Sequence, residues 1–486
     1  MESVLTSYAS LRELQAAEAG RMAERTEALF AAIARQRQLN AYLTETPEVA
    51  RAQAHASDQR MAGKEPRRLE GLLLSVKDNY CTKDIRTTAG SRILSNFVPT
   101  YDAFVFRKAI EAGAICLGKT NLDEFGMGSS TENSAFGPTL NPRGLKLGRA
   151  NIAPGGSSGG AAAAVAAGLC MAALATDTGG SIRQPAAFCG VVGMKPTYGL
   201  CSRWGIIAYG SSLDQAGVIA RTVEDTAIVI DAIVGEDEND STSSPTTIPE
   251  IESFLNAPRR RYTVGVPKSF RELSINPDLE DCWKAGEAAI KDAGFELKYV
   301  DLPSINYTLP AYYIIALSEA SSNLASYDGV RYGYRSPHAN DIIDLYEHTR
   351  AEGFRWETKK RIIMGTYALS AGYYEAYYEK ASRVRALIAR EFAAVFGEVD
   401  CLAWPTAPTP AFELGSHASD PVSMYLEDVF TVPVNLAGLP AISIPIVLAR
   451  NSLPMGLQII GPQFGDPHVF RVAKAIEDRV GKLGLA

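Results

Sequence analysis

Two serines in glycine-rich segments are the residues whose types and spacing best suit chemistry. Residues 153–160 are Ala-Pro-Gly-Gly-Ser-Ser-Gly-Gly, and residues 176–185 are Thr-Asp-Thr-Gly-Gly-Ser-Ile-Arg-Gln-Pro. Glycine has no Cβ, so backbone N–H groups in such loops can approach a substrate closely and donate to an oxygen that acquires negative charge. Loops of this composition suit an oxyanion hole beside a nucleophilic serine.

The run between the two segments, residues 161–175, is uncharged and consists mostly of alanine with valine, leucine and methionine. This composition predicts one buried helix with a serine-bearing loop at each end. A flexible linker is the alternative interpretation of Gly-Gly-Ser-Ser-Gly-Gly. The apolar run and the second Gly-Gly-Ser make the linker the weaker interpretation.

Lys77 is the candidate base for such a serine. Residues 71–76, Gly-Leu-Leu-Leu-Ser-Val, predict a buried strand that ends directly at Lys77. A serine hydroxyl is a weak nucleophile until a base takes its proton, and a lysine can be that base only where burial keeps it neutral. Most lysines are solvated surface groups, so the catalytic interpretation depends on the place of Lys77 at the strand's end.

A different catalytic arrangement is also compatible with these residues. Residues 155–159 match G-x-S-x-G, the nucleophile elbow, and His417 or His468 would complete the order Ser…Asp…His around Ser157. The elbow needs a strand directly before its first glycine, and Asn-Ile-Ala-Pro at 151–154 is a poor strand. The elbow also leaves Lys77 and the second Gly-Gly-Ser unexplained, but residue order does not exclude it.

Strand-like and helix-like segments alternate along the chain and predict an α/β fold with a mostly parallel sheet covered by helices. Amphipathic spacing predicts a helix within 8–36, and a shorter helix is expected after Pro47. Helical patterns dominate 310–398. The remaining predicted elements are strands at 71–76, 114–121, 262–267, 295–302, 400–404, 441–447 and 456–460, and helices at 102–112, 277–293 and from 466.

Composition excludes several classes of protein. The net charge of −7 argues against a chain that is itself the main surface for nucleic-acid phosphates. Seven cysteines without a C-x-x-C pair indicate neither a disulfide framework nor a zinc site, and no metal is expected. The 15-residue uncharged run is too short to span a membrane, and the start lacks a targeting pattern, so we expect a cytoplasmic protein.

Three motifs resemble the amidase signature family. They are Val76-Lys77-Asp78-Asn79, Pro154-Gly-Gly-Ser-Ser-Gly-Gly160 and Asp177-Thr-Gly-Gly-Ser-Ile-Arg-Gln-Pro-Ala186. The resemblance implies the amidase signature fold, an α/β fold with a mostly parallel mixed central sheet and helices on both faces. It also implies Ser181 as the acylated nucleophile, Ser157 as the bridging serine that relays its proton, and Lys77 as the base. The implied oxyanion hole consists of the backbone N–H groups of Thr178, Gly179, Gly180 and Ser181.

Further segments, spread over nearly the whole chain, resemble the A subunits of tRNA-dependent amidotransferases. They are more specific than the catalytic motifs, which all amidases share, and comprise Tyr312 and residues 318–324, 328–333, 360–366, 425–428 and 435–440. The sequence departs from the family pattern at Ala161, where serine is common, and at Ala175, where glycine is common. Neither position is a proposed catalytic group.

This resemblance implies a glutaminase subunit, which hydrolyses glutamine through an acyl-enzyme and supplies ammonia to convert Glu-tRNA(Gln), or Asp-tRNA(Asn), to the amidated product. Glutamine carries a carboxylate and an ammonium beyond its amide, so a specific pocket needs a cation and an anion held apart. The resemblance assigns Arg361 to the carboxylate and Asp428 to the ammonium, with Tyr312 beside them. By residue type alone, Arg361 and Asp428 would be taken for surface charges.

The resemblance also implies a heterotrimer, a carbon–nitrogen ligase with glutamine as amido donor. Its other chains are a tRNA-binding B subunit, which binds most of the misacylated tRNA, and a small C subunit. The chain contains no G-x-x-x-x-G-K-[ST] motif, so we expect no cofactor in it and place ATP and Mg²⁺ on the partner. A stand-alone amidase for another amide and a non-catalytic scaffold remain as alternatives, and the intact Lys77, Ser157 and Ser181 argue against the scaffold.

The implied organisation has four parts. Residues 1–65 form an N-terminal helical segment, 66–235 the amidase signature core with the Ser-Ser-Lys site, and 259–486 the remainder that completes the sheet and the glutamine pocket. Between them, residues 236–258 are acidic and rich in serine, threonine and proline, which predicts a linker-like surface loop.

Overall fold

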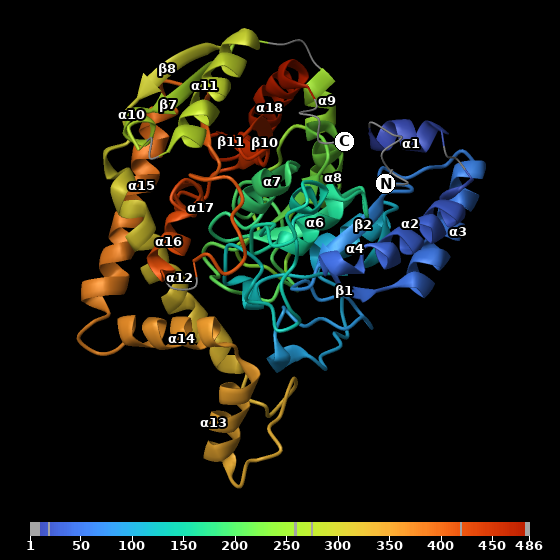
Figure 1. Ribbon diagram of the computed structural model, residues 1–486, viewed down its shortest axis with the longest axis vertical. Helices are drawn as coiled ribbons and strands as arrows, with labels where there is room; N and C mark the ends of the chain where they lie inside the picture. Colours follow the sequence, from blue (N-terminus) through green and yellow to red (C-terminus); the bar gives the residue numbers. More distant parts are fainter. Residues whose placement is uncertain (1–9, 18–19, 257–259, 274–275, 418–419, 482–486) are drawn as a thin grey trace.

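A mixed β-sheet runs through the molecule in the computed structural model, which describes residues 10–17, 20–256, 260–273, 276–417 and 420–481 (Figure 1). Within these residues the sheet has eleven strands in the order β1-β3-β2-β4-β6-β5-β10-β11-β9-β7-β8. The strands are β1 (Tyr42–Glu45), β2 (Leu73–Lys77), β3 (Ile115–Thr120), β4 (Ala172–Asp177), β5 (Val192–Lys195), β6 (Gln215–Ala220), β7 (Thr263–Pro267), β8 (Glu296–Val300), β9 (Cys401–Pro405), β10 (Ala441–Leu448) and β11 (Pro454–Ile460).

The predicted α/β fold with a mixed sheet is confirmed, but the sheet is less parallel than predicted. Among the described strands, parallel pairing is confined to β3–β2–β4 and β9–β7–β8. The other neighbours pair antiparallel. For β10 and β11 the reason lies in the connection, because residues 449–453 are all that join them and a parallel crossover needs a dozen residues or more.

Helices cover both faces of this sheet, as expected. A Cβ placed on Gly456 of β11 would lie 2.7 Å from the Cβ of Ala187. The next residue of the strand, Leu457, approaches a different helix, because its Cδ1 lies 2.8 Å from where a Cβ on Gly286 would be. Successive side chains of a strand point to opposite faces, so the helices that carry Ala187 and Gly286 lie on opposite sides. These helices are α7 (Arg183–Cys189), which contacts α6 (Gly159–Ala166), and α11 (Pro277–Asp292), which contacts α18 (Asp466–Val480).

The N-terminal segment contains more than the predicted helices. The helix predicted within 8–36 is two helices, α1 (Leu11–Ala17) and α2 (Met22–Arg35), and the chain turns between them at Gly20, whose φ is 84°. Residues 8–9 and 18–19 of that prediction lie outside the described residues. The helix after Pro47 is not short, since α3 (Pro47–Ala62) has 16 residues. Strand β1 also belongs to this segment and pairs with β3.

The prediction of one helix over 161–175 is wrong. Helix α6 ends at Ala166, Gly168 adopts a φ of 66°, and the N–H of Leu169 donates to the carbonyl of Ala164. The chain then enters β4, which is buried between β2 and β6. An uncharged run without periodicity fits a buried strand as well as a buried helix, and glycine supplies the left-handed residue that ends the helix.

The linker-like segment 236–258 is packed against the body of the protein as far as it is described; residues 257–258 are not. Asp240 is 8% exposed and accepts from the N–H of Arg203 at 2.7 Å, and the N–H of Ser244 donates to the carbonyl of Gly199 at 2.8 Å. The segment also contains helix α9 (Ile251–Asn256). It joins two halves of one sheet, because β5 of the first half pairs with β10 of the second.

The other predicted strands and helices are present within a few residues of their predicted ends, whereas β5, β6, α7 and, among the helices that follow, α5, α8, α10, α16 and α17 were not predicted. The remaining helices are α4 (Phe104–Glu111), α5 (Pro142–Lys146), α8 (Val223–Ile233), α10 (Lys268–Arg271), α12 (Thr308–Asn323), α13 (Ile342–Gly353), α14 (Trp356–Ala368), α15 (Lys380–Val395), α16 (Pro421–Leu426) and α17 (Val432–Leu436). Within the described ranges every helix is too short or too polar to cross a bilayer.

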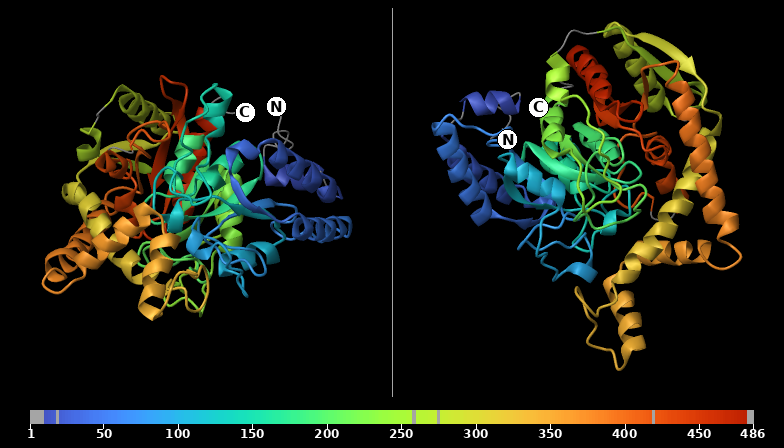
Figure 2. Two further views of the ribbon diagram at one scale, coloured as in Figure 1. Left: turned by 60° about the horizontal axis from the view of Figure 1, so that its bottom comes forward. Right: turned by 180° about the vertical axis from the view of Figure 1, so that it is seen from behind.

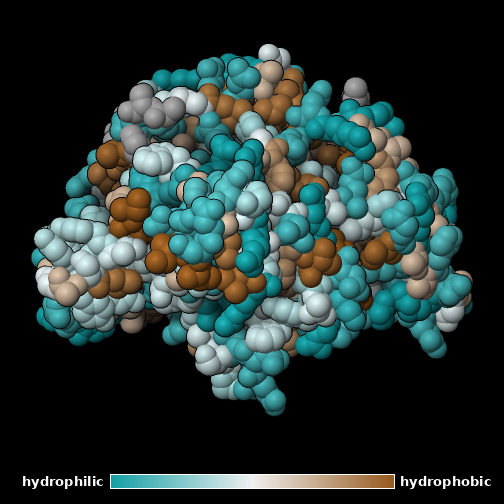
Figure 3. Space-filling model, turned by 90° about the horizontal axis from the view of Figure 1, so that it is seen from below, coloured by the Kyte–Doolittle hydropathy of each residue, from teal (hydrophilic) through white to brown (hydrophobic). Residues whose placement is uncertain are grey.

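Helices α12 to α15 form the side of the molecule opposite α2 and α3, and α13 projects at its lower end (Figures 1 and 2). Seen from below, this end shows apolar patches among polar residues (Figure 3). The exposed large apolar side chains of α13 and α14 include Ile343, Trp356 and Ile363. The opposite side of α14 is buried through Thr358, Arg361 and Gly365.

Helices α12 and α14 touch at Gly365. A Cβ at this position would lie 1.9 Å from the carbonyl oxygen of Leu317, which belongs to the backbone of α12 and has no freedom to rotate away. Glycine costs roughly 1 kcal/mol against alanine within a helix, so its presence here reflects the close approach rather than helix stability. The contact fixes the distance of α14 from the rest of the protein.

We predict that Gly365→Ala destabilises the protein by about 1–3 kcal/mol, although helix propensity alone would stabilise it, because overpacking against backbone forces the two helices apart. Urea unfolding measures the change. Gly63→Ala is the control, since its Cβ would meet no atom closer than 3.5 Å at a φ of −71°. Equal stability of the Gly365→Ala variant and the wild type would contradict a tight contact.

Candidate active site

The strand order brings the catalytic candidates to one edge of the sheet. Strands β2 and β4 are parallel neighbours, with Val76 paired to Leu174, so their carboxyl ends lie side by side. Lys77 is the last residue of β2, and the loop that carries Ser181 follows the last residue of β4. The Ser157 loop is joined to them because the N–H of Ser158 donates to the carbonyl of Ser181 at 3.2 Å.

Lys77 is fully buried and contacts hydroxyl groups. Its Nζ donates at 2.8 Å to the Oγ of Ser157, to the Oγ of Ser158 and to the Oγ1 of Thr176, and at 3.4 Å to the carbonyl of Thr176. None of the ion pairs within the described residues involves Lys77. The amine is therefore held by neutral partners, next to the serine that the sequence designates as the bridge.

Burial lowers the pKa of Lys77 to about 7, even though Asp123, Asp177 and Asp214 act in the opposite direction. A neutral amine can accept a proton, and an ammonium cannot. At pH 7 and above, a large fraction of Lys77 is thus in the form that a general base requires.

Ser181 lines a small pocket, and Ser157 is buried outside that lining. Ser181 is 8% exposed and lines the pocket, whereas Ser157 is 1% exposed. The peptide bond between Gly156 and Ser157 is cis. A Cβ on Gly126, which also lines the pocket, would come within 3.6 Å of the Ser157 Oγ. The three predicted catalytic residues, Lys77, Ser157 and Ser181, are therefore brought together.

The loop 178–181 is held by the carboxylate of Asp177. It accepts from the N–H of Gly180 at 2.9 Å and from the N–H of Ile182 at 3.1 Å. Of the four predicted oxyanion donors, Gly180 is thus already engaged. The other three are Thr178, Gly179 and Ser181, and their N–H groups donate to no acceptor within the described chain. Gly179 and Ser181 also line the pocket.

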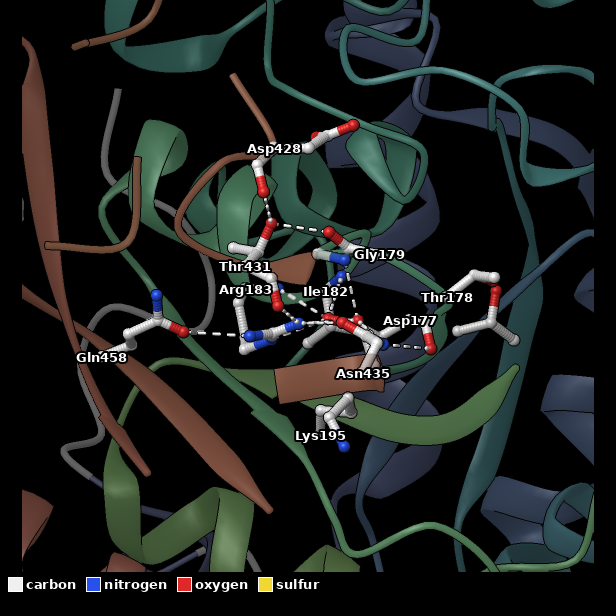
Figure 4. A network of polar contacts seen from close by, with 12 residues as sticks. Asp177, Thr178, Gly179, Ile182, Arg183, Lys195, Asp428, Thr431, Asn435 and Gln458 are labelled. Carbon is white, nitrogen blue, oxygen red and sulfur yellow. Dashed lines mark hydrogen bonds and ion pairs between the residues drawn. The ribbon is translucent and has the colours of Figure 1, made fainter. Parts of the chain in front are cut away.

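A buried ion pair fixes that carboxylate in turn (Figure 4). The guanidinium of Arg183 lies 3.0 Å from Asp177 Oδ1, and both side chains are fully buried. Although burial raises the pKa of Asp177, the Arg183 charge holds it well below its usual range. Arg183 also donates to the Oδ1 of Asn435 at 2.6 Å and to the carbonyl of Thr431 at 3.1 Å. The network therefore joins the loop that carries Ser181 to the chain that begins α17.

The pocket collects the predicted substrate residues together with four that were not predicted. Its predicted lining residues are Gly179, Ser181, Tyr312, Arg361 and Asp428, and the others are Gly126, Gly128, Ser129 and Tyr209. Ser129 belongs to the run Gly126-Met-Gly-Ser-Ser130, whose glycines could have indicated a third loop at the site. Tyr209 lies in the connection between β5 and β6, and neither its type nor its spacing marks it in the sequence.

Arg361 reaches the pocket from α14 and is 4% exposed. Its Nη1 donates to the hydroxyl of Tyr209 at 3.0 Å, and its Nε donates to Glu357 at 2.8 Å. The guanidinium also lies 5.8 Å from the ring of Tyr313 and 5.7 Å from that of Tyr425. Contacts with aromatic rings and hydrogen bonds hold the cation in place where it lines the pocket.

Asp428 supplies the negative charge of the same pocket. Its Oδ1 accepts from the Oγ of Ser129 at 2.9 Å, and its Oδ2 accepts from the hydroxyl of Tyr313 at 2.8 Å. Burial raises its pKa to about 6, so the carboxylate is mostly ionised at neutral pH. Among the described residues no ion pair joins Asp428 to Arg361, whose own partner is Glu357 through Nε at 2.8 Å, so the two pocket charges do not neutralise each other.

The elbow alternative finds no support in the geometry. His468 shares a hydrogen bond with the hydroxyl of Tyr262 at 2.8 Å, and His417 packs against the ring of Phe412. Neither histidine lines the pocket that contains Ser181. Ser157 has Lys77 rather than an imidazole as its basic neighbour.

None of the seven cysteines lines the pocket. All seven cysteines are buried and unpaired, and burial raises the pKa of the Cys189 thiol, whose Sγ lies 3.4 Å from the carbonyl of Pro154. Across the ranges that the structure describes, no group of three or more His, Cys, Asp or Glu side chains is arranged to hold a metal ion.

Comparison with known proteins gives relatives over most of the chain. The family model described as Amidase matches residues 24–470. The chain is 54% identical, over 439 residues, to the glutamyl-tRNA(Gln) amidotransferase A subunit of Parvibaculum lavamentivorans, covering 90% of this chain and 89% of that protein. It is 52% identical to the protein of the same name from Azorhizobium caulinodans, covering 94% and 93% of the two chains.

Solved structures share the fold. The glutamyl-tRNA(Gln) amidotransferase A subunit of Thermotoga maritima matches with a TM-score of 0.79 at 39% identity, covering 96% of this chain and 94% of that one. The peptide amidase of Stenotrophomonas maltophilia matches with a TM-score of 0.80 at 28% identity, covering 99% of both chains. By sequence, fold and the residues gathered at its pocket, this chain belongs to the amidase signature family.

Proposed function

We propose that this chain is the glutaminase component, the A subunit, of a tRNA-dependent amidotransferase. The observation that carries the proposal is the pocket, in which Ser181 lies with a cation, Arg361, and an anion, Asp428, that are not paired with each other. A free amino acid with a side-chain amide matches this arrangement, since its carboxylate and ammonium meet the two charges while the amide reaches the serine. Relatives at 50–54% identity carry the name of that component.

The proposed reaction begins with proton transfer. Neutral Lys77 accepts the proton of Ser157, which takes that of Ser181, and the Ser181 Oγ attacks the amide carbon of glutamine. The N–H groups of Thr178, Gly179 and Ser181 stabilise the oxyanion. The proton returns to the leaving nitrogen, ammonia departs, and water hydrolyses the glutamyl ester to glutamate, restoring Ser181.

The amidated product is made elsewhere in the complex. We propose a heterotrimer in the cytoplasm, in which a tRNA-binding B subunit uses ATP and Mg²⁺ to activate the misacylated tRNA and a small C subunit completes the assembly. The net charge of −7 and the lack of a P-loop motif in this sequence support that division of labour. Glu-tRNA(Gln) is the acceptor named for the relatives, and Asp-tRNA(Asn) would present the same chemistry.

The test compares amides. Ammonia release from glutamine should exceed that from butyramide, which has an amide but no charged head group, and Arg361→Ala or Asp428→Ala should remove the advantage. Loss of one charge-assisted hydrogen bond costs roughly 1.5–3 kcal/mol, or about ten- to a hundredfold in kcat/KM for glutamine. Activity on butyramide should stay within about threefold, because it makes neither contact.

Lys359→Ala is the matched control, since Lys359 is a cation of the same helix whose Nζ donates to the carbonyl of Ala351 outside the pocket. It should leave both activities unchanged. Equal losses on both amides in the Arg361 and Asp428 variants would assign these residues to the fold. Preference of the wild type for another amide would favour a stand-alone amidase.

A complex that contains Ser181→Ala should fail to amidate Glu-tRNA(Gln) with glutamine and should succeed with ammonium salts. The substitution removes ammonia production and leaves tRNA activation on the partner intact. Product tRNA, measured with labelled glutamate, reports the outcome. A mutant complex that ammonium cannot rescue, or an isolated chain that amidates tRNA by itself, would contradict the proposed division of labour.

A further inference from the structure

Glu124 is a fully buried carboxylate that lies outside the pocket and takes no part in the proposed chemistry. It accepts three hydrogen bonds: from the Oγ of Ser91 at 2.5 Å, from the N–H of Arg355 at 2.9 Å and from the Oγ1 of Thr358 at 2.5 Å. Two of these donors belong to the start of α14, the helix that carries Arg361. Glu124 itself follows β3 in the catalytic half of the chain, 231 residues before Arg355.

The contacts make Glu124 the anchor of the start of α14. It accepts from the N–H of Arg355, the residue directly before the helix, and from the hydroxyl of Thr358 in the first turn, whereas Arg355 itself makes no side-chain hydrogen bond to the helix. A carboxylate at a helix N-terminus also opposes the positive end of the helix dipole. Thr358 lies three residues before Arg361, so both side chains project from one face of α14. A shift at Thr358 therefore moves the guanidinium.

The segment after Glu124 reaches the other end of the site. Phe125 packs against Phe354, just before α14, with ring centroids 5.6 Å apart. Gly126 lines the pocket, and a Cβ there would lie 3.6 Å from the Oγ of Ser157. Within three residues the chain thus touches the proton relay at one end and the helix of Arg361 at the other.

The other hydrogen bonds of Arg361 do not fix the position of α14 relative to the sheet in the same way. Glu357, which accepts from its Nε, lies on α14 and moves with the helix. The hydroxyl of Tyr209 accepts from Nη1, but it ends a side chain in a connection between strands. Glu124 follows β3, which pairs with β1 on one side and β2 on the other, and it accepts from a backbone N–H at the start of α14 as well as from a side chain.

We propose that Glu124 is a positioning residue for substrate selection, which sets the distance from Arg361 to Ser181 that an amino acid with a side-chain amide requires. The inference rests on the proposed function, in which Arg361 binds the carboxylate of glutamine. Displacement of α14 misplaces that carboxylate contact and leaves the relay of Lys77, Ser157 and Ser181 in place. The displacement should therefore raise KM for glutamine and leave the activity on butyramide unchanged.

The test uses Thr358→Val and Glu124→Met in the full-length protein. Thr358→Val removes one donor without changing shape, and Glu124→Met removes the acceptor. We expect KM for glutamine to rise about tenfold in the first and more in the second, with kcat/KM for butyramide within about threefold of the wild type. Thr358→Ser and Glu124→Gln should restore most of the affinity, because a hydroxyl still donates and an amide oxygen still accepts from α14.

Asp231→Asn is the matched control, since Asp231 caps another helix, α9, by accepting from the N–H groups of Ile251 and Glu252. It should change neither KM. Parallel losses on both amides in Thr358→Val, or an unchanged KM for glutamine, would overturn the role of Glu124. Failure of the proposed function has a different signature, because the wild type itself would then show no preference for glutamine.

Discussion

The site depends on one constraint, a buried lysine that no carboxylate is free to pair with. Asp123, Asp177 and Asp214 are the carboxylates whose charges act on Lys77, and each is satisfied elsewhere. Asp123 accepts from two backbone N–H groups, Asp177 is paired with Arg183, and Asp214 accepts from the hydroxyl of Thr178 at 2.6 Å. Removal from water therefore dominates, and the amine is free to act as the proposed base instead of being half of an ion pair.

The same carboxylates build the surroundings of Ser181, the proposed nucleophile. Asp177 shapes the loop around Ser181, and its partner Arg183 reaches the chain at Thr431, whose Oγ1 donates to the carbonyl of Gly179 at 2.6 Å (Figure 4). Asp428 lies three residues earlier. Breaking a buried pair of this kind typically costs about 3–5 kcal/mol, so the Ser181 loop and the anionic side of the pocket share one rigid support.

Much of the site could be predicted because its residues sit in short, chemically distinctive motifs. Lys77, Ser157 and Ser181 were found from glycine-rich loops and a strand end, and resemblance added Arg361 and Asp428. Prediction of the fold failed where the local sequence has no distinctive pattern. The run 161–175 gave no periodicity to separate strand from helix, and the antiparallel centre of the sheet follows from long-range pairing.

Residues that act through distant contacts left no local signal at all. Tyr209 is joined to Arg361 across 152 residues, and Glu124 is joined to Thr358 across 234. Both pairs cross between the two halves of the chain, so only the folded sheet and the packing of α14 bring them together. The sequence alone would treat Glu124 as one more acidic residue, whereas its burial and its three donors define its role.

The most direct test of the central claim is the rate at which glutamine acylates the enzyme, followed by rapid quenching and mass spectrometry of peptides across a range of pH. We expect a glutamyl group on the peptide that contains Ser181. We also expect an acylation rate that rises with pH through about 7, where Lys77 loses its proton, and then levels off. A glutamyl group on Ser157, or a rate that does not change between pH 5.5 and 9, would contradict that claim.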